Sequence, residues 1–125
     1  MNNKKSEWLA HPDYQINISN VDKHICILVN ETMLADSHQT LLLSEQNHPP
    51  VYYFPRTDVR MELLHKVNKV SFCPFKGDAT YWALKENNDQ LKIIAWGYEK
   101  PFEQVSAIKN CIAFYPDQLD HIIIE

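Results

Sequence analysis

The segment Cys73-Pro74-Phe75-Lys76-Gly77 contains the residue types in this chain that most readily do chemistry. Pro74 fixes its own φ and Gly77 permits a positive φ, so the sequence predicts a pre-shaped tight turn. Such a turn can present successive backbone N–H groups to an anion, and Lys76 would add a positive charge. Cys73 is interpreted either as a nucleophile whose thiolate Lys76 favours or as a small buried hydrophobic residue in an ordinary turn.

A second candidate is the segment Tyr52-Tyr53-Phe54-Pro55-Arg56-Thr57-Asp58. Alternation along a strand sends Tyr52 and Phe54 to one face and Tyr53 to the other. Arg56 can hold a carboxylate or a phosphate through its planar guanidinium, close to the N-terminus of a short helix expected over 58–66. We expect Arg56 and the 73–77 turn to form one anion-binding corner. Asp58 is interpreted either as the N-cap of that helix or as a general base.

Two tryptophans flank the polar turn Glu86-Asn87-Asn88-Asp89 at similar distances. The sequence therefore predicts that Trp82 and Trp96 lie on paired strands, face each other across the ladder and are largely buried. The alternative is that both rings line a pocket for a flat ligand, together with Tyr52 and Tyr98. Gly97 lies between Trp96 and Tyr98 and indicates a bulge or a close backbone approach.

Two carboxylates follow apolar or aromatic residues. Glu99 lies at the end of an aromatic block, where an apolar setting would raise its pKa toward that of a useful general acid or base. The alternative is a solvated turn residue. Glu45 follows Leu41-Leu42-Leu43 and allows the same two interpretations. The candidates for catalysis are therefore Cys73, Lys76 and Glu99.

Charge and composition exclude several classes of protein. The formal net charge is −4 and the basic residues are scattered, so the chain lacks the basic footprint of a nucleic-acid-binding protein or a membrane-surface helix. The apolar runs, such as 25–29, are far shorter than the about 20 residues of a membrane span. With only two glycines, the chain can form neither a Rossmann fingerprint nor a Walker loop.

The cysteines and histidines show no recognised metal-binding spacing. Cys26, Cys73 and Cys111 are far apart, no C-x-x-C occurs, and no two histidines have the H-x₃₋₅-H spacing. We therefore expect no structural metal, no cofactor and no disulfide. Free thiols and the absence of a secretory signal at the N-terminus indicate a reducing, cytoplasmic location.

Short apolar and β-branched segments alternate with turn signals along most of the chain. This pattern predicts one mainly β domain over 14–125, preceded by an N-terminal arm over 1–13. Helical structure is expected at 58–66 and as a single turn at 102–107. The expected strands cover 15–19, 21–29, 32–37, 40–45, 51–54, 70–72, 78–84, 91–96, 112–115 and 121–124.

Four blocks of sequence, in their order and spacing, resemble a known family. They cover 50–64 (PVYYFPRTDVRMELL), 72–82 (FCPFKGDATYW), 95–101 (AWGYEKP) and 112–115 (IAFY). The family is the domain of unknown function 427 (DUF427), and the resemblance extends from about residue 20 to 121. It implies a compact antiparallel fold similar to the β-tent of Mss4-like zinc domains and methionine sulfoxide reductase B.

The resemblance does not bring an established activity with it. Zinc-binding β-tents use two C-x-x-C knuckles, which this chain lacks, so we expect a metal-free β-tent. The family is sometimes labelled nucleotidyltransferase-like. Phosphoryl transfer normally uses paired carboxylates that hold metal, and the chain has no Asp-x-Asp motif.

Two functional hypotheses follow from the sequence. The first is a small-molecule-binding domain or enzyme that takes a small anionic or aromatic ligand. Its expected ligand-binding residues are Tyr52, Arg56, Asp58, Lys76, Trp82, Trp96 and Tyr98. The second is an interaction or structural module without chemistry, which forms a homodimer through an exposed strand edge.

Overall fold

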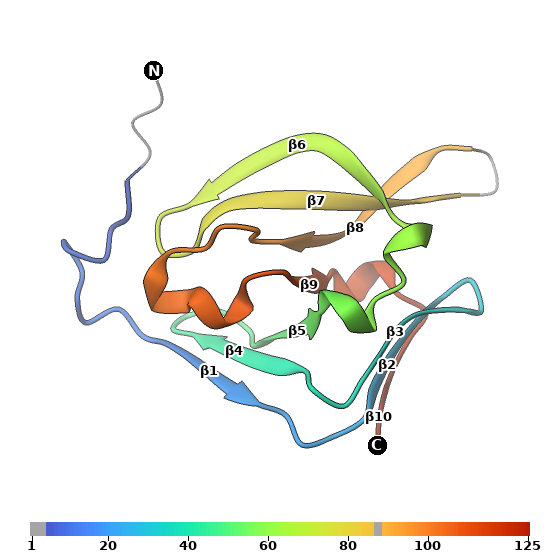
Figure 1. The fold of residues 1–125 in the computed structure, drawn as a ribbon, viewed down its shortest axis with the longest axis horizontal. Coiled ribbons are helices and arrows are strands. Elements are labelled where there is room, and N and C mark those ends of the chain that lie inside the picture. Colours follow the sequence, from blue (N-terminus) through green and yellow to red (C-terminus); the bar gives the residue numbers. More distant parts are fainter. Residues whose placement is uncertain (1–4, 87–88) are drawn as a thin grey trace.

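The computed structural model describes residues 5–86 and 89–125, which form two antiparallel sheets with short 3-10 helices between strands (Figure 1). The larger sheet has the order β1-β4-β5-β9-β8-β7-β6 and the smaller one the order β10-β2-β3. The expected mainly β, antiparallel domain is confirmed, while its closer likeness to a β-tent stays a prediction. The strands are β1 (Ile16–Asn20), β2 (Ile25–Val29), β3 (Thr32–Ser37), β4 (Leu41–Glu45), β5 (Val51–Pro55), β6 (His65–Cys73), β7 (Gly77–Lys85), β8 (Leu91–Gly97), β9 (Cys111–Phe114) and β10 (His121–Ile124).

Alternation of side chains gives the seven-stranded sheet two different faces. On β5, Phe54 belongs to one buried cluster and Tyr53 to another, as the sequence predicted. On β9, Phe114 and Ala113 divide in the same way. Each face of this sheet therefore has its own core.

The first face packs against the three-stranded sheet, and we call it the sandwich face. Ile25, Ile27 and Leu34 of the small sheet are fully or almost fully buried against large-sheet residues such as Phe54 and Trp82. In Figure 1 the small sheet lies beside one end of the large sheet, where β2, β3 and β10 run together. Burial of such side chains is the main driving force for closing the two sheets on each other.

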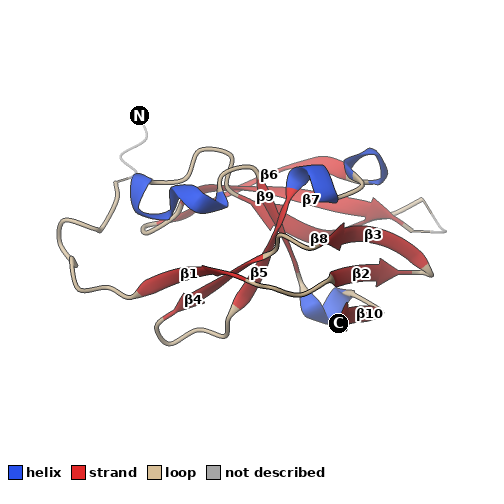
Figure 2. Ribbon diagram, turned by 60° about the horizontal axis from the view of Figure 1, so that its bottom comes forward, coloured by secondary structure: helices blue, strands red, loops and turns tan. Residues whose placement is uncertain are grey.

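The second face is covered in part by the 3-10 helix η3 (Glu103–Ile108), and we call it the pocket face. Val105 and Ile108 of η3 are buried beside Tyr53, Tyr81 and Tyr98. The expected helical turn at 102–107 is thus confirmed with a shift of one residue. Figure 2 shows that the helices are minor additions to a fold made of strands. No helix within 5–86 and 89–125 is long and apolar enough to cross a membrane.

The two glycines take the roles that the sequence predicted for them. Gly77 has a φ of +116°, and a Cβ there would lie 3.3 Å from the carbonyl oxygen of Lys100. A Cβ on Gly97 would lie 2.5 Å from the carbonyl oxygen of Cys111, which is closer than real Cβ contacts allow. Gly77 therefore shapes the β6–β7 turn, and Gly97 lets β8 approach β9 closely.

The prediction of one continuous helix over 58–66 was wrong. The chain instead forms two separate 3-10 helices, η1 (Arg56–Asp58) and η2 (Met61–Leu63), and β6 begins at His65. Buried Val59 makes a β-bridge with Ala35, and the backbone N–H of Arg60 donates to the carbonyl of Leu34 at 2.8 Å. These tertiary contacts to β3 stop a continuous helix, overriding local propensity.

Candidate functional site

An open pocket of about 610 Å³ lies on the pocket face, between the β4–β5 loop, the 73–77 turn and the ends of β8 and β9. Its walls are mainly aromatic, and several groups that could take part in chemistry lie among them. The aromatic residues are Tyr14, Tyr53, Phe75, Tyr81, Trp96, Tyr98 and Tyr115. The other groups are Glu45, His48, Cys73 and Lys76. This mixture of apolar wall and few polar groups is typical of small-molecule sites.

A buried ion pair lies in the wall of this pocket. The Nζ of Lys76 is 2.5 Å from Oε1 of Glu45, and both side chains are only 10% exposed. The Tyr14 hydroxyl donates a hydrogen bond to Oε2 of the same carboxylate. Burial opposes ionisation of Glu45, but the hydrogen bonds from Lys76 and Tyr14 outweigh it and hold the pKa of this carboxyl below its ordinary value. Glu45 is therefore a carboxylate at neutral pH.

Local structure explains why Lys76 and Glu45 meet. In the turn, the backbone N–H of Lys76 donates to the carbonyl of Cys73 at 3.2 Å, while the Lys76 carbonyl accepts from Phe102 at 2.9 Å. Along β4, Glu45 follows buried Leu43 at a spacing of two and so projects from the same pocket face. The turn also brings the Cys73 sulfur to 3.7 Å from Lys76 Nζ.

The N-terminal segment packs against the 73–77 turn. The Trp8 indole N–H donates to the Phe75 carbonyl at 2.9 Å, and the rings of Tyr14 and Phe75 stack with centroids 3.8 Å apart. The backbone N–H of Glu7 donates to the Pro74 carbonyl at 2.9 Å. The part of the expected 1–13 arm that the structure describes is thus docked on the turn, while residues 1–4 lie outside the described ranges. This docking places Tyr14 in the site.

The aromatic wall is made of rings that contact one another and keep their hydroxyl protons. Trp96 lies edge-on to Tyr53, with centroids 6.5 Å apart, and 4.5 Å from the ring of Tyr115. Burial raises the pKa values of Tyr53 and Tyr98 far above the ordinary phenol value and that of Tyr115 to about 12. All three hydroxyls are therefore neutral at physiological pH and can donate hydrogen bonds.

A second charged cluster lies on the sandwich face. Arg56 Nη1 donates to Glu99 Oε2 at 3.1 Å, and Lys66 Nζ and the Thr80 hydroxyl donate to Glu99 Oε1 at 3.3 and 3.2 Å. The Arg56 guanidinium also stacks over Trp82, 5.0 Å from the ring centre. The hydrogen bond from Arg56 is the main cause that lowers the pKa of Glu99, so the interpretation of Glu99 as an acid or base with a raised pKa was wrong.

Arg56 and Lys76 do not form the single corner that we expected. Arg56 pairs with Glu99 over Trp82, whereas Lys76 pairs with Glu45 on the opposite face of the sheet. The sequence could not reveal that Arg56 and Lys76 lie on opposite faces. Their separation depends on which face of the large sheet packs against the small sheet, and this is a property of the fold.

The two tryptophans also separate. Their strands β7 and β8 pair as predicted, but Trp82 lies opposite Ala95 and Trp96 opposite Tyr81. This register differs by one residue from the expected one, so the two indoles project from opposite faces. Trp82 is buried in the core, and Trp96 is half-buried in the pocket wall. Within the expected turn between them, residues 87–88 lie outside the described ranges.

The remaining candidate residues, Tyr98, Tyr52 and Asp58, lie in three different parts of the molecule. Tyr98 lines the main pocket, but Tyr52 lines a separate cavity of about 140 Å³ that also borders Trp96. Asp58 accepts a hydrogen bond from the Ser37 hydroxyl at 2.7 Å, and no side-chain cap bond is found at η1 or η2, so the helix-cap interpretation was wrong. Of the seven expected ligand-binding residues, the main pocket brings together Lys76, Trp96 and Tyr98.

Sequence reasoning missed most of the tyrosines in this pocket. Strand alternation separated Tyr53 from Tyr52, but it could not tell which of these faces would carry a cavity. Tyr81 gave a usable signal, since it alternates with Trp82 on β7. Tyr14 gave none, because it precedes the first strand and enters the site through tertiary contacts with Phe75 and Glu45.

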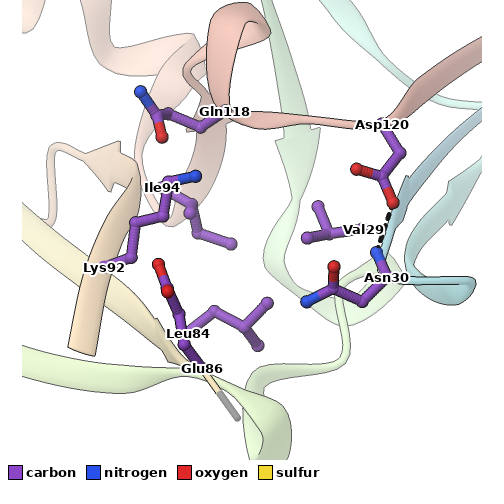
Figure 3. A pocket seen from close by; sticks show the side chains of 8 residues that line it. All are labelled: Val29, Asn30, Leu84, Glu86, Lys92, Ile94, Gln118 and Asp120. Atoms are coloured by element: carbon purple, nitrogen blue, oxygen red, sulfur yellow. Dashed lines mark hydrogen bonds between the residues drawn. The ribbon is translucent and has the colours of Figure 1, made fainter. Parts of the chain in front are cut away.

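Another cavity, of about 370 Å³, lies between the β2–β3 turn, the ends of β7 and β8 and the segment after η4 (Pro116–Gln118) (Figure 3). Here Asp120 accepts a hydrogen bond from the backbone N–H of Asn30 at 2.5 Å. Among the described residues, its other charged lining residues are Glu86 and Lys92, and this part of the lining includes no aromatic residue, cysteine or histidine. This cavity offers far less for recognition than the aromatic pocket, which is therefore the candidate site.

Comparison with known proteins supports the resemblance that the sequence blocks suggested. No curated protein matches the chain. The family model described as "Domain of unknown function (DUF427)" matches residues 17–125, which covers all ten strands except the first residue of β1. The chain therefore belongs to the DUF427 family.

Proposed function

We propose that the aromatic pocket binds a small planar molecule, and that the Glu45–Lys76 pair recognises the polar edge of that molecule. The observation that carries this proposal is the convergence of tyrosine and tryptophan rings with a buried ion pair on one open pocket of about 610 Å³. Flat rings pack well against such walls, and a few buried polar groups fix their orientation.

The charges of the pocket favour a neutral polar ligand. Lys76 is already neutralised by Glu45 at 2.5 Å, so an incoming anion would meet the carboxylate as well as the ammonium. An ammonium has three N–H donors; Glu45 takes one of them, and the Cys73 sulfur accepts a weaker second hydrogen bond at 3.7 Å. A ligand carbonyl or ring nitrogen would suit the remaining donor capacity better than a phosphate would.

Chemistry on the bound molecule is a further part of the proposal. Cys73 borders the pocket with its sulfur 3.7 Å from Lys76 Nζ. His48 also lines the pocket, with Nε2 3.9 Å from Glu45 Oε2. Cys73 is thus the candidate nucleophile, and Lys76 and His48 are the polar side chains of the pocket that could contact the bound molecule beside it.

A thermal-shift measurement with simple probes tests the binding proposal. Indole, adenine and nicotinamide represent flat neutral ligands, whereas inorganic phosphate and acetate represent anions. We expect at least one flat probe to raise the melting temperature, since a ligand at 100 times its Kd adds about 2.7 kcal/mol of stability. We expect phosphate and acetate to have no such effect.

Two variants locate the binding. Trp96→Leu removes a ring of the pocket wall and should abolish the stabilisation by the flat probe. Arg56→Gln is the matched control, because Arg56 belongs to the cluster on the opposite face. If phosphate alone stabilises the protein and Arg56→Gln removes that effect, the proposal is wrong and the Arg56 cluster is the ligand site.

Self-association is a second candidate function, favoured by the exposed edge strand β10. Ile122, Ile123 and Ile124 are each 39–45% exposed on this strand, which forms one edge of the small sheet. Such an edge can pair with a second copy of the chain. Sedimentation velocity should then give a dimer that Ile124→Lys converts to a monomer, whereas Val70→Lys on edge strand β6 leaves it dimeric. A monomeric wild-type protein would contradict this candidate.

We also propose that the protein works in the reducing cytoplasm. Its three cysteines, Cys26, Cys73 and Cys111, are free thiols in separate parts of the fold. Burial raises the pKa of Cys111, which keeps that thiol protonated. Thiol titration of protein isolated without reductant should find three thiols per chain, and a smaller number would contradict the proposal.

A further inference from the structure

The outer side of the three-stranded sheet brings together side chains from three strands. In the β2–β3 pairing, Cys26 lies directly opposite Asp36. His24 precedes Cys26 by two residues and projects from the same side. The backbones of His24 and Glu125 exchange hydrogen bonds of 3.1 and 2.9 Å, which continues the β2–β10 pairing by one residue. A histidine and a cysteine that are two residues apart thus become neighbours of an aspartate from the next strand.

The ligand atoms of these residues converge on one point. Cys26 Sγ is 3.3 Å from His24 Nε2 and 3.8 Å from Asp36 Oδ1, and His24 Nε2 is hydrogen-bonded to that same Oδ1. All three atoms lie within 4.8 Å of one another. The metal–ligand bond lengths of a tetrahedral zinc site, about 2.0–2.3 Å, imply ligand atoms about 3.3–3.6 Å apart. The two distances to sulfur are close to this range.

We propose that His24, Cys26 and Asp36 bind a divalent transition-metal ion of the zinc, cobalt or nickel type. The protein ligands are His24 Nε2, Cys26 Sγ and Asp36 Oδ1, with water in the remaining position. Mixed nitrogen, sulfur and oxygen ligands suit these borderline ions better than magnesium or calcium, which prefer oxygen alone. The ion replaces the direct His24–Asp36 hydrogen bond, and the 55% exposed Asp36 side chain has room to rotate.

The same three residue types could instead suggest a nucleophilic triad, but the geometry is against it. In a triad, one imidazole nitrogen faces the nucleophile and the other faces the carboxylate. Here the Nε2 of His24 contacts both Cys26 and Asp36. A single nitrogen that shares one point with a sulfur and an oxygen fits coordination of an ion rather than relay of a proton.

Two neighbours position the His24 ring. His38 stacks on it, with ring centroids 4.2 Å apart and an angle of 11° between the planes. The Nδ1 of His24, on the other side of the ring, faces Glu125 Oε2 at 3.8 Å. Metal-binding histidines usually direct their second nitrogen to such a carboxylate, which fixes the orientation of the ring.

This site differs from the metal-free expectation drawn from cysteine and histidine spacing. That expectation considered knuckles and helical histidine pairs, whose ligands lie a few residues apart. Here the His-x-Cys pair comes from strand alternation and the aspartate comes from the neighbouring strand. A His-x-Cys pair on a strand, followed by a hairpin with an acidic residue opposite the cysteine, is the signal to look for.

Titration of the full chain with Co²⁺ tests the proposal, after removal of metal with a chelator. We expect saturation at one equivalent and a near-ultraviolet band from charge transfer between thiolate and cobalt. Cys26→Ser should abolish this band, whereas Cys73→Ser, the matched control on another part of the fold, should keep it. Zn²⁺ should displace the cobalt.

Cys26 is buried, so its substitution can weaken the fold, and a second pair of variants keeps the test decisive. His24 and Asp36 are 30% and 55% exposed, and His24→Ala and Asp36→Asn should stay folded by near-ultraviolet circular dichroism. Each should weaken Co²⁺ binding by more than the about 10–100-fold that loss of an outer partner costs. The proposal is overturned if wild-type protein gives no thiolate–cobalt band, if Cys26→Ser keeps the band, or if these folded variants bind Co²⁺ as tightly as wild type.

Discussion

Two clusters of paired charges lie on opposite faces of the same sheet and differ in their exposure to water. Glu45 and Lys76, on the pocket face, are each 10% exposed, whereas Arg56 and Glu99, on the sandwich face, are 33% and 36% exposed. In the first pair, Glu45 is the last residue of β4 and Lys76 lies in the β6–β7 turn. In the second, Arg56 follows β5 directly and Glu99 lies in the segment after β8. Similar ion pairs can therefore have different roles in one small fold. A charge that is exposed to water loses little free energy when its partner is removed, whereas a buried charge loses much more.

The buried pair is costly to form and more costly to break. Moving two ions out of water carries a penalty of several kcal/mol per ion, which their attraction and further hydrogen bonds must offset. Glu45 meets this need with Lys76 and with the Tyr14 hydroxyl. Since a buried ion pair often adds little net stability, the position of this pair beside an open pocket fits a role in recognition better than a role in holding the fold together.

The exposed cluster has different surroundings. Arg56 covers the ring of Trp82 at 5.0 Å, so its apolar stem and flat guanidinium shield the edge of the core. Lys66 and Thr80 give Glu99 further partners, so losing any one of them leaves the carboxylate hydrogen-bonded. This redundancy indicates a surface contact that tolerates substitution.

The largest effect should come from removing one charge of the buried pair. Lys76→Met leaves the Glu45 carboxylate buried without its cation, and we expect a loss of about 3–5 kcal/mol in the free energy of unfolding. Urea denaturation monitored by tryptophan fluorescence measures it. Arg56→Met, the matched variant in the exposed cluster, should cost much less.

A double variant then distinguishes two quantities: the net contribution of the buried pair to the free energy of unfolding, and the cost of leaving one buried charge without its partner. Glu45→Leu combined with Lys76→Met removes both charges together, and we expect most of the loss in Lys76→Met to be recovered. If the double variant is as unstable as Lys76→Met alone, the pair itself stabilises the fold and the comparison between the clusters has to be revised.

These clusters also show what could be predicted from the sequence. Strand alternation, turn residues and the two glycines indicated most strands, and the turn at Asn30-Glu31 has the positive φ values of 52° and 65° typical of a hairpin. The 58–66 helix failed because Val59 and Arg60 bond to β3, which is a tertiary contact without a local signal. The turn containing Lys76 was singled out, but its partner Glu45 was recognised only as an ambiguous carboxylate.

The division of the candidate site between two faces could not be read from the sequence. A one-residue difference in register places Trp82 and Trp96 on opposite faces, and a bulge between Trp82 and Ala83 shifts the later pairs again. Local sequence specifies neither the register nor the position of the small sheet. Each candidate residue therefore stays a prediction, but the grouping of these residues into one site was wrong because it depended on the register and on the position of the small sheet.

Acid should distinguish the clusters through the lowered pKa values of their carboxyl groups. The pKa of Glu45 in the folded protein lies below its unfolded value of about 4.3, so its contribution is fully present above that pH and is lost as pH falls through the folded pKa. The stability difference between wild type and Glu45→Gln should therefore shrink as the pH falls below about 5. Urea denaturation across this range measures the difference.

The matched variant Glu99→Gln serves as the control for that experiment. The pKa of Glu99 is also lowered, mainly by Arg56, so the sign of its pH dependence is the same. Its dependence should be weaker because the group is more exposed. A steeper dependence for Glu99 than for Glu45 would contradict the assignment of Glu45 as the more strongly coupled carboxylate.

Tyr14→Phe should have an intermediate effect. It removes one hydrogen bond to the Glu45 carboxylate while keeping the ring stacked on Phe75. A hydrogen bond to a charged group contributes about 1.5–3 kcal/mol, and partial access of water should keep the loss near the lower end. Urea denaturation measures the loss, and if stability is unchanged, the N-terminal segment does not contribute to the buried pair.

The smallest effect should come from Glu99→Gln in the exposed cluster. Exposed ion pairs contribute about 0–1 kcal/mol, and the neutral amide can still accept from Arg56 or Thr80. Mobile ions reach this cluster, so 1 M NaCl, where the Debye length is about 3 Å, should remove what difference remains between variant and wild type. The loss caused by Lys76→Met should largely persist at the same salt concentration, because the Glu45 carboxylate is only 10% exposed and a partly buried charge is screened much less than an exposed one. Equal salt sensitivity of the two variants would mean that both clusters are open to solvent, and the pocket-face pair would then lose the desolvated character on which its recognition role depends.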